Sequence, residues 1–126
     1  MKSIWIRTIA CSLALGLAFP SAAWANYFCN GSIESAAISP DGFVTINSPA
    51  AGLSFVRLCS VNSTVNNGVY GISPDACKGI LATVLRAQAT GATVQWGFID
   101  EPTTCAGHTA WQQLTGWYWG PAVMNQ

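Results

Sequence analysis

The sequence predicts a small β-rich α+β domain that is cross-linked by disulfides and preceded by a secretory signal. Three observations lead to this fold class. Strand patterns occupy both halves of the chain, and a single long helical pattern separates them. The cysteines that remain after the signal are even in number and widely spaced. Strands grouped around one helix are typical of an α+β domain or of a small barrel with a helix across one end.

Residues 1–25 are predicted to be a cleavable signal peptide. A basic start precedes an uncharged apolar run over Ile9–Phe19, and Ala23-Trp24-Ala25 supplies small residues at the two positions that a signal peptidase reads. We therefore expect cleavage before Asn26. The alternative is a retained membrane anchor, but the apolar run is shorter than the roughly 20 residues that span a bilayer. The expected mature domain, residues 26–126, is secreted or periplasmic.

The charge of the mature domain argues against several classes of partner. Three strong cations stand against five acids, which gives a net charge of −2. Nucleic acid binding needs a cluster of Lys and Arg, and docking to anionic membranes needs a basic patch, so neither is expected. No membrane span is expected after the signal is removed. The surface must consist largely of uncharged polar residues, which suits recognition by hydrogen bonds or burial in an oligomer.

Removal of Cys11 with the signal leaves four cysteines, which we expect to form two disulfides. A zinc site is the alternative, but zinc ligands usually come in close pairs and these four are scattered. Each disulfide would stabilise a small domain by about 2–4 kcal/mol. Three pairings are possible. We favour Cys59–Cys77, between the third strand and the helix start, and Cys29–Cys105, between the N-terminus and the last loop.

Three strand patterns precede the helix. The first covers residues 32–38 and the second covers 43–47, and Ser39-Pro40-Asp41-Gly42 between them predicts a hairpin turn. The third covers Leu53–Val61. Strict alternation in this strand places four residues on one face, namely Leu53, Phe55, Arg57 and Cys59. A polar, Gly-rich loop is expected over residues 62–72.

The helix is predicted over residues 74–90. Ser73 is a good N-cap, Pro74 suits the first helical position, and Asp75 complements the helix dipole. Gly91 is placed to end the helix. The apolar stripe at helical spacing consists of Cys77, Ile80, Leu81, Val84 and Leu85.

Two strand patterns follow the helix. Residues 92–99 alternate, with Trp96 on the face that is expected to be buried. A loop over 103–109 carries His108, and the last strand is expected near Gly116–Trp119. Five strands with a helix between the third and the fourth match an OB-fold-like five-stranded barrel.

Three segments resemble a family of small exported bacterial proteins: Leu58–Val61, Ser73–Cys77 and Leu85–Val94. This family is similar to the receptor-binding B subunit of subtilase cytotoxin, an AB5 toxin. There too a Cys-Ser ends the third strand, a helix follows, and a Thr-Gly leads into the next strand. The resemblance implies an OB-fold, a pentameric ring and binding to cell-surface glycans.

The resemblance covers roughly residues 29–99, and the segment 111–126 departs from the toxin subunit. The family's sugar-contacting serine falls nearest to Cys29–Ser32. This placement makes Asn30 and Ser32 candidate ligand residues.

No catalytic set stands out in the sequence. His108 is the only histidine, and no Gly-x-Ser-x-Gly element occurs. Asp100 and Glu101 are adjacent, whereas glycoside hydrolysis needs carboxylates on opposite sides of a substrate. No phosphate-binding loop and no metal-ligand pattern is found. We therefore expect a non-enzymatic protein without a cofactor or a metal.

Trp117, Tyr118 and Trp119 are further candidate ligand or interface residues. In a regular strand, Trp117 and Trp119 share one face and Tyr118 takes the other. Such rings suit a barrel core, a subunit interface or a platform for sugar rings. The sequence thus predicts an exported glycan-binding module. The alternative is an exported structural or inhibitory protein that binds another protein through its aromatic C-terminal segment.

The signal prediction can be tested on the exported protein. Its N-terminal residue is expected to be Asn26, because the small residues before it fit signal peptidase. Intact-mass measurement of the protein recovered from the periplasm or medium checks this. A mass that includes residues 1–25 would contradict the prediction.

Overall fold

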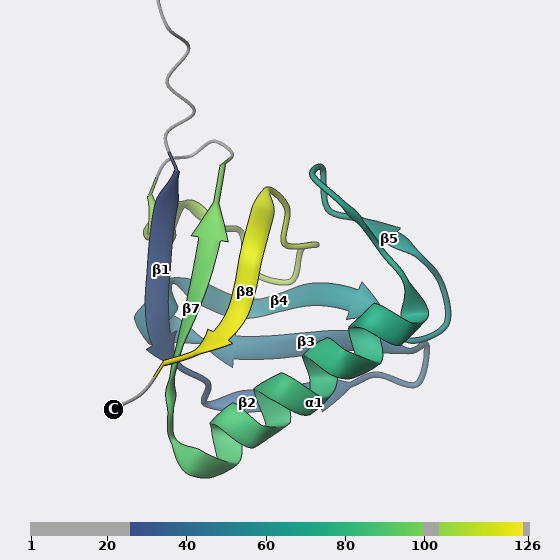
Figure 1. Ribbon diagram of the computed structural model, residues 1–126, viewed down its shortest axis with the longest axis horizontal. Coiled ribbons are helices and arrows are strands. Elements are labelled where there is room, and N and C mark those ends of the chain that lie inside the picture. The colour runs from purple at the N-terminus through teal and green to yellow at the C-terminus, as the bar shows by residue number, and fades with distance from the viewer. Residues whose placement is uncertain (1–25, 100–103, 125–126) are drawn as a thin grey trace, which may run out of the picture.

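A computed structural model of the chain describes residues 26–99 and 104–124 (Figure 1). Two features discussed above lie outside these residues, namely the signal peptide over 1–25 and the adjacent pair Asp100 and Glu101. The described part contains two three-stranded sheets, a two-stranded sheet and one long helix, so the β-rich α+β class is confirmed. None of its helices is long and apolar enough to cross a membrane.

The first sheet consists of β1 (Tyr27–Ser32), β7 (Thr93–Phe98) and β8 (Trp117–Val123), with β7 in the centre. Both strand pairs are antiparallel. Alternate side chains of β7 point into the core, where Trp96 and Phe98 are completely buried. β7 matches the strand expected there, and β8 is longer than expected.

The second sheet consists of β2 (Ser35–Ile38), β3 (Phe43–Ser48) and β4 (Leu53–Ser60), joined in sequence as antiparallel hairpins. The predicted turn between β2 and β3 is confirmed, since the Gly42 N–H donates a hydrogen bond to the Ser39 carbonyl at 2.8 Å. Figure 1 shows the strands of the two sheets crossing steeply. The core therefore lies between two sheets whose inner faces meet at a large angle.

The first predicted strand is divided between the two sheets. A single strand was expected over 32–38, but β1 ends at Ser32 and β2 begins at Ser35. Close to this division, Gly31 lets β1 approach η1 (Pro49–Ala51), because a Cβ at this position would collide with the η1 backbone. The sequence pattern missed this division because both halves are extended and differ only in their partner strands.

The strand pairs do not close into a barrel. Among the described residues, one parallel bridge links the sheets, between Arg57 in β4 and Gln113 ahead of β8. The five-stranded barrel expected from the order of elements is thus not confirmed. A small sheet of β5 (Val65–Asn66) and β6 (Gly71–Ile72) lies in the segment that was expected to be a loop.

The helix α1 (Pro74–Thr90) has the predicted bounds. The Ser73 hydroxyl accepts a hydrogen bond from the Ala76 N–H at 3.1 Å, and Gly91 ends the helix in the left-handed conformation. The buried stripe is narrower than expected, because α1 contacts β2, β4 and β8 along one side and Leu85 is turned away from them. Its fully buried residues are Cys77, Val84 and Ala87.

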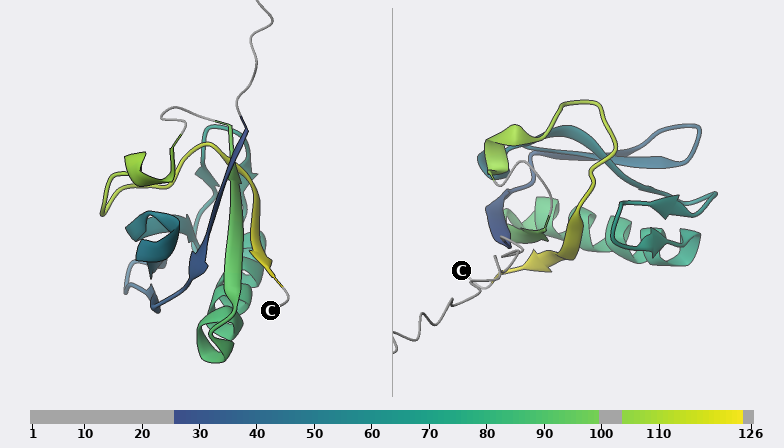
Figure 2. Two further views of the ribbon diagram at one scale, coloured as in Figure 1. Left: turned by 90° about the vertical axis from the view of Figure 1, so that its left-hand side faces the viewer. Right: turned by 90° about the horizontal axis from the view of Figure 1, so that it is seen from above.

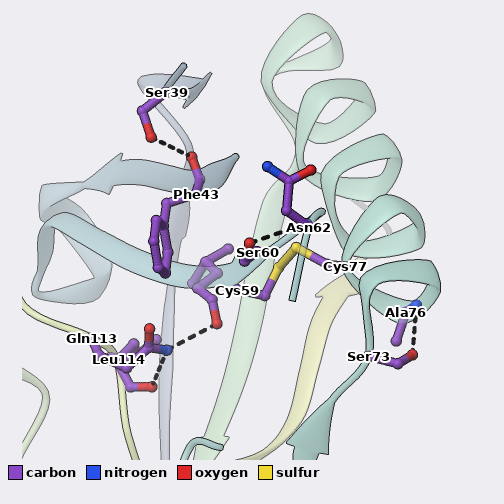
Figure 3. The surroundings of a disulfide bond; sticks show 11 residues. Ser39, Phe43, Cys59, Ser60, Asn62, Ser73, Ala76, Cys77, Gln113 and Leu114 are labelled. Atoms are coloured by element: carbon purple, nitrogen blue, oxygen red, sulfur yellow. Dashed lines mark hydrogen bonds between the residues drawn. A yellow bond between two sulfur atoms is a disulfide. The ribbon is translucent and has the colours of Figure 1, made fainter. Parts of the chain in front are cut away.

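Two disulfides cross-link the fold, and they are the two pairs that the sequence favoured. Cys29–Cys105 joins β1 to η2 (Cys105–Gly107), and Cys59–Cys77 joins β4 to the first turn of α1. Figure 3 shows the second bond beside the capped start of the helix. The first bond spans 76 residues of the chain and the second spans 18, and together they fix the last loop and the helix to the sheets.

A bulge in β4 changes which of its side chains are buried. Phe55 has a φ of +49°, and the register of β3 against β4 shifts next to it. Leu53 before the bulge is buried, whereas Phe55 and Arg57 are exposed. A second register shift, between Arg57 and Cys59, returns Cys59 to the core. The predicted common face for these residues is therefore wrong, because the extra residue of a bulge reverses the alternation beyond it.

Asn67 holds the β5–β6 hairpin against the first sheet. Its buried side chain donates to the Trp117 carbonyl at 2.8 Å and accepts from the N–H groups of Val69 and Tyr70 at 2.9 Å and 2.8 Å. Its own carbonyl accepts from the Gly116 N–H at 2.7 Å. One amide thus satisfies three backbone groups that would otherwise lack partners.

Replacement of this side chain should destabilise the domain. We expect Asn67→Ala to lower the free energy of unfolding by about 2–4 kcal/mol, since it leaves buried backbone groups without partners. Urea denaturation followed by circular dichroism measures the change.

The neighbouring Asn66→Ala is the matched control. Its side chain bonds only the exposed Gly68 N–H among the described contacts, so a loss below about 1 kcal/mol is expected. Equal losses for Asn66→Ala and Asn67→Ala would contradict the role of Asn67.

Candidate functional site

The outward side of the first sheet gathers most of the residues predicted to bind a ligand. Alternate residues of β1 and β7 point away from the core. The strand register sets them in three cross-strand pairs, which are Phe28–Gly97, Asn30–Gln95 and Ser32–Thr93. β8 adds Tyr118 and Trp119 on the same side. We call the surface formed by these eight residues the outer face.

A bulge in β8 decides which of its aromatic residues reach the outer face. Phe98 pairs with Trp117 and Gly97 pairs with Trp119, so two steps along β8 match one step along β7. Trp117 therefore points inward and is 5% exposed, whereas Trp119 is 51% exposed. The prediction that Trp117 and Trp119 share one face is wrong, because it assumed a regular strand.

Trp117 is a residue of the core. Its ring packs edge-on against Trp96, with the ring centroids 5.5 Å apart, and its Nε1–H donates to the Leu114 carbonyl at 3.1 Å. Of the uses that the sequence left open for the aromatic segment, Trp117 takes the core position. It is therefore removed from the candidate ligand residues, and Tyr118 and Trp119 remain.

Three aromatic rings of the outer face converge on Gly97. A Cβ on this glycine would lie 2.9 Å from the Trp119 Cβ, 3.0 Å from the Phe28 Cε1 and 3.2 Å from the Tyr118 Cζ. Phe28 and Tyr118 meet edge-on with their ring centroids 6.5 Å apart. Phe28 and Trp119 each remain about half exposed. The missing side chain of Gly97 thus allows the rings to lie close to the sheet.

Polar groups continue the outer face beyond the rings. Asn30 is exposed and Gln95 is half-buried, and the two lie opposite each other next to the row that holds Phe28. Each primary amide carries both donors and an acceptor. Ser32 and Thr93 place hydroxyl groups at the next pair. The outer face therefore combines flat apolar rings with uncharged hydrogen-bonding groups.

Sequence reasoning missed four residues of the outer face, which are Phe28, Thr93, Gln95 and Gly97. The alternation of Phe28 and Asn30 around Cys29 is the signal that could have identified the first of them. The alternation of β7 was recognised, but nothing in the sequence pairs β7 with β1. The candidates therefore become one surface only when these two strands are paired.

His108 lies outside this surface. Its Nε2 is 3.3 Å from the Tyr27 hydroxyl, and its ring centroid is 4.4 Å from that of Phe98. Within residues 26–99 and 104–124, no three His, Cys, Asp or Glu side chains are grouped so that they could hold a metal ion. His108 is thus a half-buried ring that packs the last loop against the first sheet.

The carboxyl of Asp41 also lies apart from the outer face, in the β2–β3 turn. A hydrogen bond from the Ser39 hydroxyl lowers the pKa of this carboxyl, and the positive charge of Arg57 acts weakly in the same direction. Asp41 is therefore ionised at neutral pH. The contacts of Asp41 fix the β2–β3 turn. The outer face, by contrast, contains no charged residue.

The role of Gly97 can be tested by adding one methyl group. We expect Gly97→Ala to destabilise the domain by about 1–3 kcal/mol, since the Trp119 Cβ is close to rigid backbone and cannot move aside freely. Thermal and urea unfolding measure the loss. Gly79→Ala is the control, because that helical site has open space and alanine should stabilise it by about 1 kcal/mol. A neutral Gly97→Ala would show that the rings do not depend on this glycine.

Comparison with known proteins adds no relative. No protein-family model, no curated protein and no solved structure matches the chain. The outer face is therefore interpreted from its own geometry and chemistry.

Proposed function

We propose that the protein is an exported, non-enzymatic module that binds glycans through its outer face. The observation that carries this proposal is the arrangement of exposed rings beside amide groups on one rigid sheet. Phe28 and Trp119 flank Gly97, and Asn30 and Gln95 follow in the next row. All of these groups are uncharged.

Sugars match both parts of this surface. One side of a pyranose ring presents mainly C–H groups, which pack on an aromatic ring, and its hydroxyl groups both donate and accept hydrogen bonds. The amides of Asn30 and Gln95 also donate and accept, so they suit a ligand edge of mixed character. Because the residues come from strands and not from loops, little conformational entropy is lost when a ligand binds.

The fold supports the ligand class of this proposal. We infer an OB-type open barrel, because β1 passes directly into β2 and so links the two sheets. On the other side, the Arg57 N–H donates to the Gln112 carbonyl at 3.0 Å, and the Leu114 N–H donates to the Arg57 carbonyl at 2.8 Å. OB-folds bind oligonucleotides and oligosaccharides. The few cations of this chain favour the second class.

The resemblance to the toxin B subunit points to glycans on cell surfaces and to a pentameric ring. Two disulfides agree with a protein that works in an oxidising compartment, as secreted and periplasmic proteins do. We include the pentamer in the proposal as the form that would repeat the outer face around one assembly. Repetition strengthens binding to clustered glycans without any new contact within a site.

A protein partner is the second candidate, and the end of β8 favours it. β8 lies at the edge of its sheet, and Val123 and Met124 are exposed near Trp119. An edge strand with apolar side chains can pair with a strand of another chain. Such a partner would cover Val123, whereas a glycan on the outer face would not need it.

A glycan array with the mature protein tests the proposed function. We expect Trp119→Ala to weaken binding to the best glycan by about tenfold or more, which is about 1.4 kcal/mol, because it removes an exposed stacking ring. Isothermal titration calorimetry with that glycan measures the loss.

Val123→Lys on the same strand is the control and should leave glycan affinity unchanged. The proposal would be contradicted if the mature protein bound no glycan, or if the Trp119→Ala variant kept full affinity. Loss of a captured protein partner in Val123→Lys would instead favour the second candidate.

A further inference from the structure

A second pair of aromatic rings lies on the outward side of the other sheet. Phe55 in the β4 bulge stacks on Trp111 from the segment between η2 and β8, with ring centroids 4.6 Å apart and ring planes within 5° of parallel. Trp111 is 64% exposed and Phe55 is 38% exposed. Figure 2 shows that this segment lies on the side of the molecule away from α1. One face of the indole is covered by Phe55, and the rest is open to solvent.

Both residues of this pair have an unfavourable backbone conformation. Phe55 has a φ of +49° and Trp111 has a φ of +64°. They are the residues other than glycine with a positive φ in the described chain. Bulky side chains rarely adopt this conformation, because the Cβ crowds the backbone. A strained residue persists only where its surroundings fix it, and such residues concentrate at functional sites.

The surroundings do fix the pair. The Trp111 N–H donates to the Phe55 carbonyl at 3.1 Å, and two further backbone hydrogen bonds join residues 112–114 to Arg57. The Cys29–Cys105 disulfide anchors the start of the segment, and Gly52 packs against the Cys105 carbonyl so closely that a Cβ would collide with it. Both rings are exposed, so packing in the core does not maintain the strained backbone of Phe55 and Trp111.

Two potential hydrogen-bond donors lie close to the rings in the sequence. The Arg57 guanidinium lies over the Phe43 ring, 5.1 Å from its centroid, and Arg57 is two residues along β4 from Phe55. Gln112, next to Trp111, is exposed. One cation is too few to bind a nucleic acid backbone. A flat ring with a few donors around it is instead suited to a single ring-shaped ligand with acceptor oxygens.

We propose that Phe55 and Trp111 form a second saccharide subsite, separate from the outer face. One sugar ring packs on the open face of the Trp111 indole, and Gln112 donates a hydrogen bond to its oxygens. Arg57 adds a second donor when its side chain leaves the Phe43 ring. Phe55 holds the indole in place. The face of the Phe55 ring that stacks on the indole does not contact the sugar. The ligand class rests on the proposed function, but the two sites lie on different sheets and can be tested separately.

Nuclear magnetic resonance separates the two sites, because each tryptophan has its own indole Nε1–H signal. The mature protein is titrated with methyl glycosides of neutral hexoses, N-acetylhexosamines and uronic acids. We expect at least one sugar to shift the Trp111 signal in a saturable manner. The backbone amide signal of Gln112 reports the same binding in variants that lack the Trp111 indole. In Trp111→Asn the affinity measured from it should fall at least tenfold, while the titration of the Trp119 signal is retained. Asparagine is chosen because it adopts a positive φ more readily than most residues other than glycine.

Tyr70→Asn is the matched control. Tyr70 is 59% exposed on the β5–β6 hairpin, so it is an equally accessible ring outside both sites. This variant should leave both titrations unchanged. Thermal melting of each variant separates loss of binding from loss of the fold, and the melting temperature of Trp111→Asn should change by only a few degrees.

The possible outcomes distinguish this proposal from the proposed function. A Trp119 signal that titrates while the Trp111 signal stays fixed would overturn the second subsite and leave the outer face standing. The reverse result would support the second subsite and overturn the outer face. No shift of either signal with any sugar would overturn both. Unchanged sugar affinity in Trp111→Asn would also overturn the subsite and leave Trp111 with a structural role alone.

Discussion

The central position of β7 is the constraint on which the rest of the structure depends. β7 pairs with both β1 and β8, and its inward side chains, including Trp96 and Phe98, are completely buried. Its outward side carries Gln95 and Gly97, which shape the outer face. Core and candidate site are therefore two sides of one strand. A change that shifts the register of β7 would exchange these sides, because successive residues of a strand point in opposite directions.

Two bulges determine which aromatic residues are exposed. The bulge in β8 turns Trp117 inward and Trp119 outward, and the bulge in β4 turns Phe55 outward to meet Trp111. Each partly exposed ring gives up part of the roughly 1.5–3 kcal/mol that full burial could provide. A domain of this size has little stability to spare. The two disulfides offset such losses, since each contributes about 2–4 kcal/mol by restricting the unfolded chain.

The absence of charge from the outer face has consequences for how a ligand would be held. Stacking and hydrogen bonds act at short range and depend on geometry, whereas salt screens mainly the attraction between exposed charges. Binding there would be nearly independent of salt concentration. Arg57 gives the other sheet a different character, because a guanidinium forms stronger hydrogen bonds with oxygen acceptors than a neutral amide does. If both surfaces bind sugars as proposed, their unlike chemistry would select different sugar units.

The sequence by itself determined the features that depend on neighbouring residues. The bounds of α1 follow from the Ser73 cap and the Gly91 end, and the β2–β3 turn follows from its own four residues. For the disulfides the sequence left three pairings open, and the structure shows the favoured one. Only the tertiary structure decided the division of β1 from β2, and only it decided that Trp117 is buried whereas Trp119 is exposed. These depend on which strands pair and where a bulge shifts their register, and both result from contacts between distant segments that a local pattern does not contain.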